Sequence, residues 1–551
     1  MQNTVLDGIL FARLLRGGAA CLKANAMTVN DLNVFPIPDG DTGDNMFLTI
    51  NSGASAVGEG YDSLSQTAGK AASGMLLGAR GNSGVILSRI FAGLSKGFEG
   101  VAQADVKKLG AAFESGVSEA YGAVSVPVEG TILTVLKDSV AAANSAITDD
   151  STLEEYFADF SAELQRSLER TPDLLDVLRD AGVVDSGGAG LGYIIDGFIN
   201  ALGGDIAASE AYSAPQTHSV DLDAFSADSV LEFGYCTEFL LRLQTGKVDI
   251  ENFNEEEIAD YLNKVGDSVV CFREGTVVKV HVHTKKPGDI LNEMQRYGEF
   301  LTFKMENMTL QHNENHMSEK LAATAKKKTP RKPFGIVSVA AGKGIKNAFS
   351  EQGCDVVVDG GQSMNPSAED LIAAFRHINA DVIFVFPNNS NIIMTANQAA
   401  QLYDEAEICV LPTKTIGEGY AAISMLDTTL GSTEAIIAEL EEIISGVVTG
   451  MVSRAVRDTE MNGVEVRKDD YIGFVGDTVY TDSPDRCAAA EELCEAAGAK
   501  RYDIMLLVCG ESVTPDEAQT LYNKLQKKYR RTEIVMIDGG QPVYDYIIIL
   551  E

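Results

Sequence analysis

Hydrophobic residues recur with a helical period through the first 200 residues of the chain. One stripe has spacings of three and four residues, which place its members on one face of a helix: Leu153, Tyr156, Phe157, Phe160, Leu164 and Leu168. Ser151 followed by Glu154 predicts a capping box at the start of that helix. A second stripe consists of Ile132, Val135, Leu136 and Val140. No convincing alternating strand precedes residue 200, so this region is expected to be all-α.

The period changes after residues 204–220, a small, polar and aperiodic segment that is typical of a linker. Two runs rich in β-branched residues follow, at 268–272 and 276–284, and a short turn joins them. In the second run, valines alternate with Lys279, His281 and His283, so the two sets lie on opposite faces of a strand. The middle region is therefore expected to be α+β.

A second linker, residues 320–333, is basic and contains prolines. Its six lysines and arginines could bind nucleic acid, but in so acidic a chain they fit a solvated tether better. Beyond it, short apolar strands alternate with helical stretches, as in an α/β domain. The expected strands are residues 334–339, 382–386, 408–411, 504–508 and 534–537. The tetrapeptide DGGQ occurs twice, at 359–362 and 538–541, which suggests two related halves.

Together these patterns predict a multidomain chain. We expect an all-α domain over residues 1–203, a small α+β domain over 221–319 and an α/β domain over 333–551. A chain of 551 residues is long enough to bury several such cores without disulfides.

Composition restricts the class of partner. The 80 acidic and 44 basic residues give a net charge of −36, which repels nucleic acid and anionic lipid. Any anionic substrate must be met by local cations, backbone N–H groups or metal ions. The eight cysteines are scattered and form no CxxC pair, as expected in a reducing compartment. With no signal peptide and no apolar run of about 18 residues, we expect a cytoplasmic protein without a membrane span.

The strongest chemical motif is the loop NVFPIPDGDTGDNM at residues 33–46. Asp39 and Asp41 are two residues apart in a turned loop and can converge on one cation. Carboxylates suit Mg²⁺, which takes its remaining ligands from water and substrate phosphates. The following residues, 42–45, lead into a helix whose N–H groups can face an anion. The alternative is an acidic turn that binds no ligand.

Three further polar loops each lead into a helix. They are GARGNSG at 78–84, VEGTI at 128–132 and VDSGGAG at 184–190. Glycines at such places let backbone N–H groups approach phosphate oxygens. One such loop is more often an ordinary connection, but four in one helical domain indicate a single rim that binds one anionic ligand.

The middle region carries a possible metal site. His281 and His283 lie on one face of a strand, roughly 6.6 Å apart. That spacing suits one zinc ion, and the thiolate of Cys236 would be a natural third ligand. The alternative is that strand histidines and a buried thiol never meet.

In the C-terminal region, polar loops follow two of the expected strands. Loops after the carboxyl ends of strands are where α/β sheets bind ligands. Asn388, Asn391, Thr413 and Lys414 could therefore form a further site.

The four N-terminal loops resemble the nucleotide-binding domain of the dihydroxyacetone kinase L-subunit family. With YCTEF, VKVHVHT, GGQSMNPS, PNNSN and PTKTIGEGYAA, essentially all 551 residues resemble the ATP-binding subunit of bacterial fatty acid kinase. The resemblance implies an antiparallel barrel of eight helices in the first domain. It also implies that ATP is bound with two Mg²⁺ ions, and that the middle-domain cysteine and histidines meet at a metal.

The resemblance also assigns roles to residues. The Mg²⁺ positions are Asn33, Asp39 and Asp41, where Asn33 replaces an aspartate of the dihydroxyacetone family and lacks its charge. From the chemistry of phosphoryl transfer, and not from the resemblance, Arg80 is a further candidate catalytic residue besides Asp39 and Asp41, one that would stabilise the transferring phosphoryl group. The nucleotide positions are Thr42, Gly43, Asp44, Asn45, Asn82, Ser83, Thr131, Ile132, Asp185, Ser186 and Gly187.

The expected activity is phosphorylation of a fatty acid carboxylate to an acyl phosphate, for phospholipid metabolism. A separate fatty-acid-binding protein would present the acid and would dock on the C-terminal domain. A fatty acid is ionised at pH 7, so the reaction needs positioning and charge neutralisation more than a strong base. The alternatives are a kinase for dihydroxyacetone or a similar small molecule, and a non-catalytic nucleotide-sensing scaffold. We also expect a homodimer.

Overall fold

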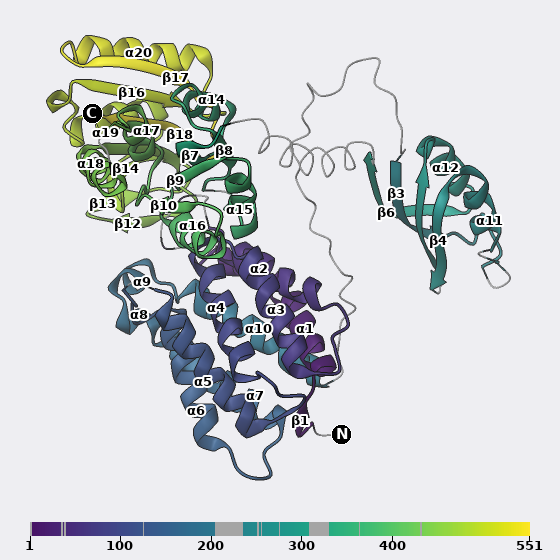
Figure 1. The fold of residues 1–551 in the computed structure, drawn as a ribbon. Coiled ribbons are helices and arrows are strands. Elements are labelled where there is room, and N and C mark those ends of the chain that lie inside the picture. The colour runs from purple at the N-terminus through teal and green to yellow at the C-terminus, as the bar shows by residue number, and fades with distance from the viewer. Residues whose placement is uncertain are drawn as a thin grey trace. The chain divides into compact units, whose positions relative to one another are not determined.

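The computed structural model divides the chain into two compact units (Figure 1). The first unit combines Met1–Tyr212 with Pro330–Glu551, and the second is Ser213–Thr329. The structure describes residues 3–32, 34, 37, 40–124, 126–203, 235–250, 253–254, 256–274, 276–307, 330–362, 364–429 and 432–551. The first expected linker, 204–220, lies outside the described residues, as does 320–329 of the second.

The N-terminal part of the first unit is helical, as predicted. Each long helix packs against the next one in sequence, and α10 packs against both α7 and α1. The antiparallel barrel itself remains a prediction. The helices are α1 (Gly8–Asn30), α2 (Thr42–Val57), α3 (Leu64–Gly78), α4 (Gly81–Gly97), α5 (Val106–Gly122), α6 (Ile132–Ala146), α7 (Leu153–Glu169), α8 (Thr171–Leu174), α9 (Asp176–Ala181) and α10 (Ser186–Gly203).

Helix α7 shows how far the hydrophobic stripe determines packing. The predicted stripe is buried, and the rings of Phe113 and Phe160 lie 5.3 Å apart between α5 and α7. The capping box, however, consists of Thr152 and Glu155, so its predicted position at Ser151 was one residue too early.

The prediction that no strand precedes residue 200 also needs a correction. Strands β1 (Val5–Leu6) and β2 (Ala104–Asp105) form an antiparallel ladder. Each strand is two residues long, and so short a segment has no alternation that a sequence pattern could reveal.

The second unit is α+β, as expected. Its four-stranded antiparallel sheet has the order β4-β5-β3-β6. The predicted valine face of β5 is buried, and it belongs to one hydrophobic cluster with Ile258 and Leu262 of α11. The elements are β3 (Tyr235–Leu243), α11 (Glu256–Val265), β4 (Asp267–Glu274), β5 (Val277–Thr284), α12 (Pro287–Met294) and β6 (Gly298–Asn307).

The C-terminal part of the first unit is α/β and is built on two principal sheets. The first is parallel, with strand order β10-β9-β7-β8. Helices α15 and α16 share a hydrophobic cluster with one of its faces. Its elements are β7 (Lys332–Ala340), α14 (Lys343–Glu351), β8 (Val356–Asp359), α15 (Ala368–Arg376), β9 (Ala380–Phe386), α16 (Ser390–Leu402), β10 (Glu407–Val410), α17 (Ile416–Ser424) and α18 (Thr433–Gly446).

The second sheet has six strands in the order β15-β14-β11-β18-β16-β17 and is mixed. Helices α19 and α20 share a hydrophobic cluster with one of its faces. Between β11 and β14 in the sequence, β12 and β13 form a small antiparallel hairpin. The elements are β11 (Val448–Arg454), β12 (Thr459–Met461), β13 (Val464–Val466), β14 (Tyr471–Val475), β15 (Thr478–Ser483), α19 (Arg486–Ala496), the 3₁₀ helix Ala499–Arg501, β16 (Ile504–Cys509), α20 (Pro515–Lys528), β17 (Glu533–Asp538) and β18 (Tyr544–Leu550).

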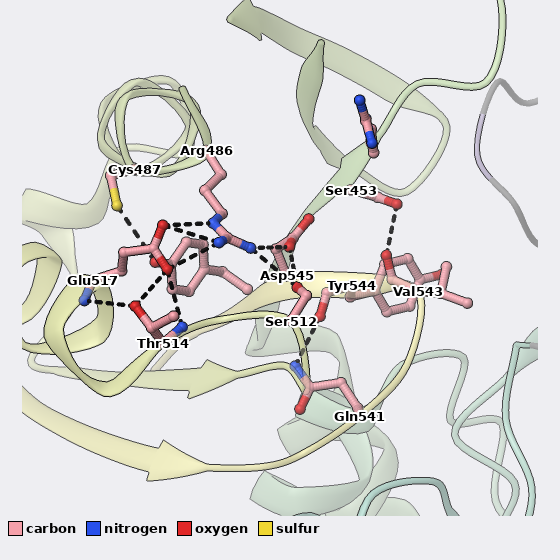
Figure 2. Close-up of polar contacts among 12 residues, drawn as sticks. Ser453, Arg486, Cys487, Ser512, Thr514, Glu517, Gln541, Val543, Tyr544 and Asp545 are labelled. Carbon is pink, nitrogen blue, oxygen red and sulfur yellow. Dashed lines mark hydrogen bonds and ion pairs between the residues drawn. The ribbon is translucent and has the colours of Figure 1, made fainter. Parts of the chain in front are cut away.

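A closed polar network ties this sheet to its helices (Figure 2). Arg486, at the start of α19, donates to Asp545 on β18 at 2.8 Å and to Glu517 on α20 at 2.9 Å. Thr514 forms a capping box with Glu517, and hydrogen bonds from Thr514 and Arg486 hold the pKa of Glu517 at about 2. Ser512 also donates to Asp545. Both carboxylates share Arg486 as their cationic partner, so the network joins β18 to α19 and α20.

Candidate active site

The four predicted N-terminal loops converge on one cavity of about 270 Å³. Helices α2, α4, α6 and α10 all begin beside it, so several positive helix ends face the same space. The lining residues are Asp41, Thr42, Asn45, Asn82, Ser83, Ile86, Val124, Val126, Val128, Thr131, Ile132, Leu133, Asp185, Ser186, Gly187, Asn391 and Met394. The structure therefore brings nine of the eleven predicted nucleotide positions together.

No N-cap side chain closes the first turn of α2, α4 or α6. The residues at these positions are Asp41, Arg80 and Thr131, and none of their side chains caps the backbone of its helix, although in α2 the backbone N–H of Gly43 donates to Asn30 at 2.7 Å. The first N–H groups of a helix have no partner within the helix, so they need a cap, water or a ligand. Their position beside the cavity suits an anionic ligand such as a phosphate.

Asp41 places a carboxylate at the cavity wall. Burial is the main cause that raises its pKa to about 6, although hydrogen bonds from Asn45 and Asn365 favour the charged form. A buried carboxylate is costly without a positive partner, so a cation in the cavity would stabilise it. The other predicted Mg²⁺ positions, Asn33 and Asp39, lie outside the described residues.

Asp185 is a second acidic group at the cavity. Burial raises its pKa to about 6, while hydrogen bonds from the backbone of Gly188 and Ile132 counteract this shift. The Gly188 bond is 2.7 Å long. Among the described residues, no lysine or arginine lines the cavity. Two carboxylates without a basic side chain are an arrangement that suits metal ions.

One wall of the cavity is apolar. Val124, Val126, Ile86, Leu133 and Met394 lie there, and Val126 is 76% exposed. Sequence reasoning missed this wall, although the run VSVPV at 124–128 is unusually apolar for a surface loop. An exposed apolar surface next to helix N-termini can accept a flat organic ring.

The C-terminal domain also contributes to the cavity. Helix α16 packs against α4, and its Asn391 and Met394 line the cavity. Asn82 donates a hydrogen bond from Nδ2 to Asn391 Oδ1 at 3.3 Å. The sequence did not predict this contact between Asn82 and Asn391, because the two residues are 309 positions apart.

The residues expected to form one C-terminal site lie at two different cavities. Asn388 and Lys414 line a second cavity of about 50 Å³, together with Gln362 and Gln541 of the two DGGQ tetrapeptides. Thr413 accepts a hydrogen bond from the backbone of Asn388 at 3.0 Å. Asn391 belongs instead to the first cavity.

Three predicted residues, Gly43, Asp44 and Arg80, do not line the first cavity. Asn30 accepts from the backbone of Gly43 at 2.7 Å and donates to Asp44 at 2.8 Å, so these contacts fix the start of α2. Arg80 donates from Nη1 to the backbone oxygen of Asn365 at 2.7 Å. Its predicted role at the phosphoryl group stays a prediction.

The middle-domain metal residues are placed by strand register alone. Cys236 on β3 is the register partner of His283 on β5, and His281 pairs with the next-but-one residue of β3, Glu238. The side chains of Cys236, His281 and His283 lie outside what the structure describes. Elsewhere among the described residues, no group of three histidine, cysteine or acidic side chains could hold a metal ion. The zinc site therefore remains a prediction.

Three family models cover most of the chain. Residues 36–200 match the DAK2 domain, 232–315 the middle domain of FakA-like fatty acid kinase proteins, and 335–551 the C-terminal domain of the same proteins. Protein YloV of Bacillus subtilis (strain 168) is 39% identical over 100% of both chains. The chain belongs to the FakA-like fatty acid kinase family. An uncharacterized protein of Staphylococcus aureus (strain USA300) is 36% identical over 99% of both chains.

Solved structures of other proteins show a more distant likeness. A DegV family protein of Thermus thermophilus, described by its fatty acid binding, has a TM-score of 0.31 and 14% identity. The Streptococcus pneumoniae Fak B3 protein, loaded with linoleic acid, has a TM-score of 0.28 and 11% identity. Each match covers 40% of this chain and 99% of the other. The likeness is too distant to assign a ligand to this chain. Among the described residues, no helix is both long and apolar enough to cross a membrane.

Proposed function

We propose that this chain is an ATP-dependent kinase that phosphorylates the carboxylate of a fatty acid. A carboxylate oxygen forms a bond to the γ-phosphorus, the bond from that phosphorus to the β–γ bridging oxygen breaks, and the products are an acyl phosphate and ADP. The observation that carries the proposal is the cavity where four helix N-termini meet the buried carboxylates of Asp41 and Asp185. Family membership supports a kinase.

The residues of the cavity fit Mg²⁺. Asp41 offers a hard oxygen ligand, and its raised pKa is consistent with a carboxylate that lacks a compensating charge. Asp41, with Asp39 and Asn33 from the same loop, would hold the metal, which neutralises charge on the phosphates. Asn33 would contribute an uncharged oxygen, so we propose that the carboxylates supply most of the affinity for the two expected ions.

Different parts of the cavity suit different parts of ATP. Asn82 and Ser83 at the start of α4, and Ser186 at the start of α10, can donate hydrogen bonds to phosphate oxygens. The apolar wall around Val124 and Val126 can accept the adenine ring. Because a fatty acid is already ionised at neutral pH, these residues must orient the acceptor and neutralise charge, and no strong general base is needed.

The acyl substrate requires a partner in this proposal. The apolar side chains of the cavity form one short wall suited to a base, and the sequence contains no evident tunnel motif for a long acyl chain. We therefore propose that a separate fatty-acid-binding protein presents the carboxylate. The homodimer and the cytoplasmic location expected from the sequence remain predictions.

A transfer assay tests the function. The purified full chain is mixed with ATP, Mg²⁺ and fatty-acid-loaded candidate partner proteins, and hydroxylamine traps any acyl phosphate. We expect acyl hydroxamate only when chain, ATP and partner are all present. Phosphorylation of dihydroxyacetone without acyl transfer would favour the small-molecule kinase. ATP binding without turnover on any acceptor would favour the scaffold.

We further propose that the middle domain binds one zinc ion through Cys236, His281 and His283. The strand register supports this, because it pairs Cys236 with His283 and puts His281 two residues along β5. Metal analysis of protein purified without a histidine tag should find about one equivalent of zinc, lost in His281→Ala. The same zinc content in that variant would remove these residues as ligands. Nucleotide affinity should change little, since both histidines belong to the second unit.

A further inference from the structure

A residue of the C-terminal domain contacts the candidate metal ligand directly. Asn365 donates a hydrogen bond from Nδ2 to Asp41 Oδ2, although the two residues are 324 positions apart. Asn365 is only 1% exposed, and it lies between β8 and α15. Asp41 lines the cavity, so the amide holds the carboxylate at the cavity wall.

The loops around this contact are fastened to each other. Arg80 donates to the backbone oxygen of Asn365 at 2.7 Å, and its guanidinium lies 3.5 Å from Asp370. The backbone N–H of Ala368 donates to the backbone oxygen of Ala79 at 3.3 Å. The backbone and side chain of Asn365 are therefore both held by the loop before α4 and by Asp41.

Gly81 makes room for the amide. Its backbone φ is +58°, a conformation that residues with a side chain rarely adopt. A Cβ there would lie 2.6 Å from Asn45 Nδ2 and 3.3 Å from Asn365 Nδ2. Both amides hydrogen-bond Asp41, so the glycine lets two donors approach one carboxylate.

We propose that Asn365 is a positioning residue for Asp41, so that the C-terminal domain completes the metal site of the kinase. The proposal rests on the proposed function. The bond from Asn365 occupies Oδ2 and, together with the bond from Asn45, orients the carboxylate, while the remaining lone pairs stay available to a cation. Partners that orient a metal ligand in this way typically change metal affinity about 10-fold to 100-fold. Arg80 acts in the same assembly by anchoring the backbone of Asn365.

The competing explanation is that Asn365 only joins two domains. Gln401 provides a matched control, because it accepts a hydrogen bond from Arg89 at 2.9 Å in the contact between α16 and α4 and does not line the cavity. If the Asn365 contact only holds the two domains together, Asn365→Ala and Gln401→Ala should have the same effect on the Mg²⁺ dependence of ATP binding.

The first experiment measures ATP binding to the full chain by calorimetry at increasing Mg²⁺ concentrations. We expect Asn365→Ala to raise the half-saturating Mg²⁺ concentration about 10-fold or more. Gln401→Ala should leave it unchanged. Asn365→Leu, which keeps the number of side-chain heavy atoms but has no donor, should show the same shift and replaces the alanine variant if that variant does not fold. An unchanged Mg²⁺ dependence in a folded Asn365 variant would overturn the proposal.

A double-mutant cycle shows whether the effect passes through Asp41. In an Asp41→Ala background, Asn365→Ala should produce no further change in the Mg²⁺ dependence of ATP binding. An equal loss in both backgrounds would show that Asn365 acts by another route and would overturn the proposal. Neither readout requires an acyl acceptor. If ATP binds as expected but no fatty acid is phosphorylated, the proposed function fails and the positioning role stands.

Discussion

Helices of the N-terminal region begin in two different ways. Asp7, Asp105 and Thr152 accept hydrogen bonds from the first turns of α1, α5 and α7. The residues in the same position before α2, α4 and α6 do not. Helix α3 also lacks a side-chain cap, but its first N–H groups donate to the backbone of residues 101 and 102. Three of the long helices, α2, α4 and α6, therefore begin at the cavity without a side-chain cap at the N-cap position, whereas α10 begins there with the backbone N–H of Gly188 bonded to Asp185 at 2.7 Å.

Charged groups show the same contrast. Arg486 forms ion pairs with both Glu517 and Asp545, and the pKa of Glu517 falls to about 2. At the cavity, burial raises the pKa of Asp41 and of Asp185 to about 6. The first two carboxylates have a cationic partner within the protein, whereas Asp41 and Asp185 accept hydrogen bonds from amide groups and, among the described residues, no basic side chain lines their cavity. Four predictions test this contrast, from the largest expected effect to the smallest.

Asp41→Ala should reduce phosphoryl transfer more than about 100-fold, because even an indirect partner of a metal ligand accounts for about that much affinity. The change removes charge from a loop and no core packing, so the circular dichroism spectrum should be retained. Asp39→Ala is expected to behave alike. The assay is hydroxylamine trapping of acyl phosphate at saturating Mg²⁺, and near-normal turnover would contradict the metal assignment.

Arg486→Ala should destabilise the C-terminal domain by about 3 kcal/mol, because it leaves the carboxylate of Asp545, whose side chain is 9% exposed, without its cation. Lys524→Ala is the matched control, since Lys524 pairs with Glu491 at the surface and should cost less than about 1 kcal/mol. Thermal unfolding measures both effects. The Mg²⁺ dependence of ATP binding should not change, and equal costs in the two variants would break the comparison.

Asp185→Asn should stabilise the ligand-free protein at pH 7 while weakening ATP binding. The pKa of Asp185 is raised from 3.8 to about 6 in the folded chain, so between these values the folded state binds more protons than the unfolded state. Stability from this group is therefore lost as the pH rises through that window, by at most about 3 kcal/mol. The Tm advantage of the variant should grow from pH 4 to pH 7, and a constant difference would contradict the argument.

Two threonines provide the smallest test. Thr152→Ala removes a working cap and should cost about 1 kcal/mol of stability without changing ATP affinity. Thr131 donates instead to the backbone oxygen of Val128 at 2.8 Å and caps nothing in α6. Thr131→Ala should change stability by less than about 0.5 kcal/mol and should weaken ATP binding. If thermal unfolding and calorimetry showed that Thr131→Ala lowers stability and Thr152→Ala weakens ATP binding, the missing cap of α6 would not be related to ligand binding.

Features that depend on neighbours in sequence could be predicted. The stripe of α7 and the valine face of β5 follow directly from the periods of helix and strand. The four loops could be grouped because each carries its glycines and donors within a few residues. The capping box shifted by one residue because Ser151–Glu154 and Thr152–Glu155 both fit the pattern, but Glu154 accepts from Asn3 while Glu155 accepts from the backbone of Thr152.

Features that depend on distant segments could not be predicted. Asn365 and Asn391 meet the N-terminal loops only after the domains pack, and neither carries a local signal for that position. Strand β18 is buried along its whole length, so its continuous apolar run does not reveal which strands it joins. Its antiparallel partners β11 and β16 lie on either side of it.

The cavity is assembled from segments that a ribosome makes far apart in time. The last residue of the helical region that lines the cavity is Gly187, and the next lining residues along the chain are Asn391 and Met394. At about 5–20 residues per second, roughly 200 residues of synthesis separate them by about 10–40 s. During that interval the nascent chain carries an N-terminal region whose cavity still lacks one wall. The cavity can therefore be complete only after residue 394 has been synthesised, so a chain truncated before that residue is expected to bind nucleotide less tightly than the full chain.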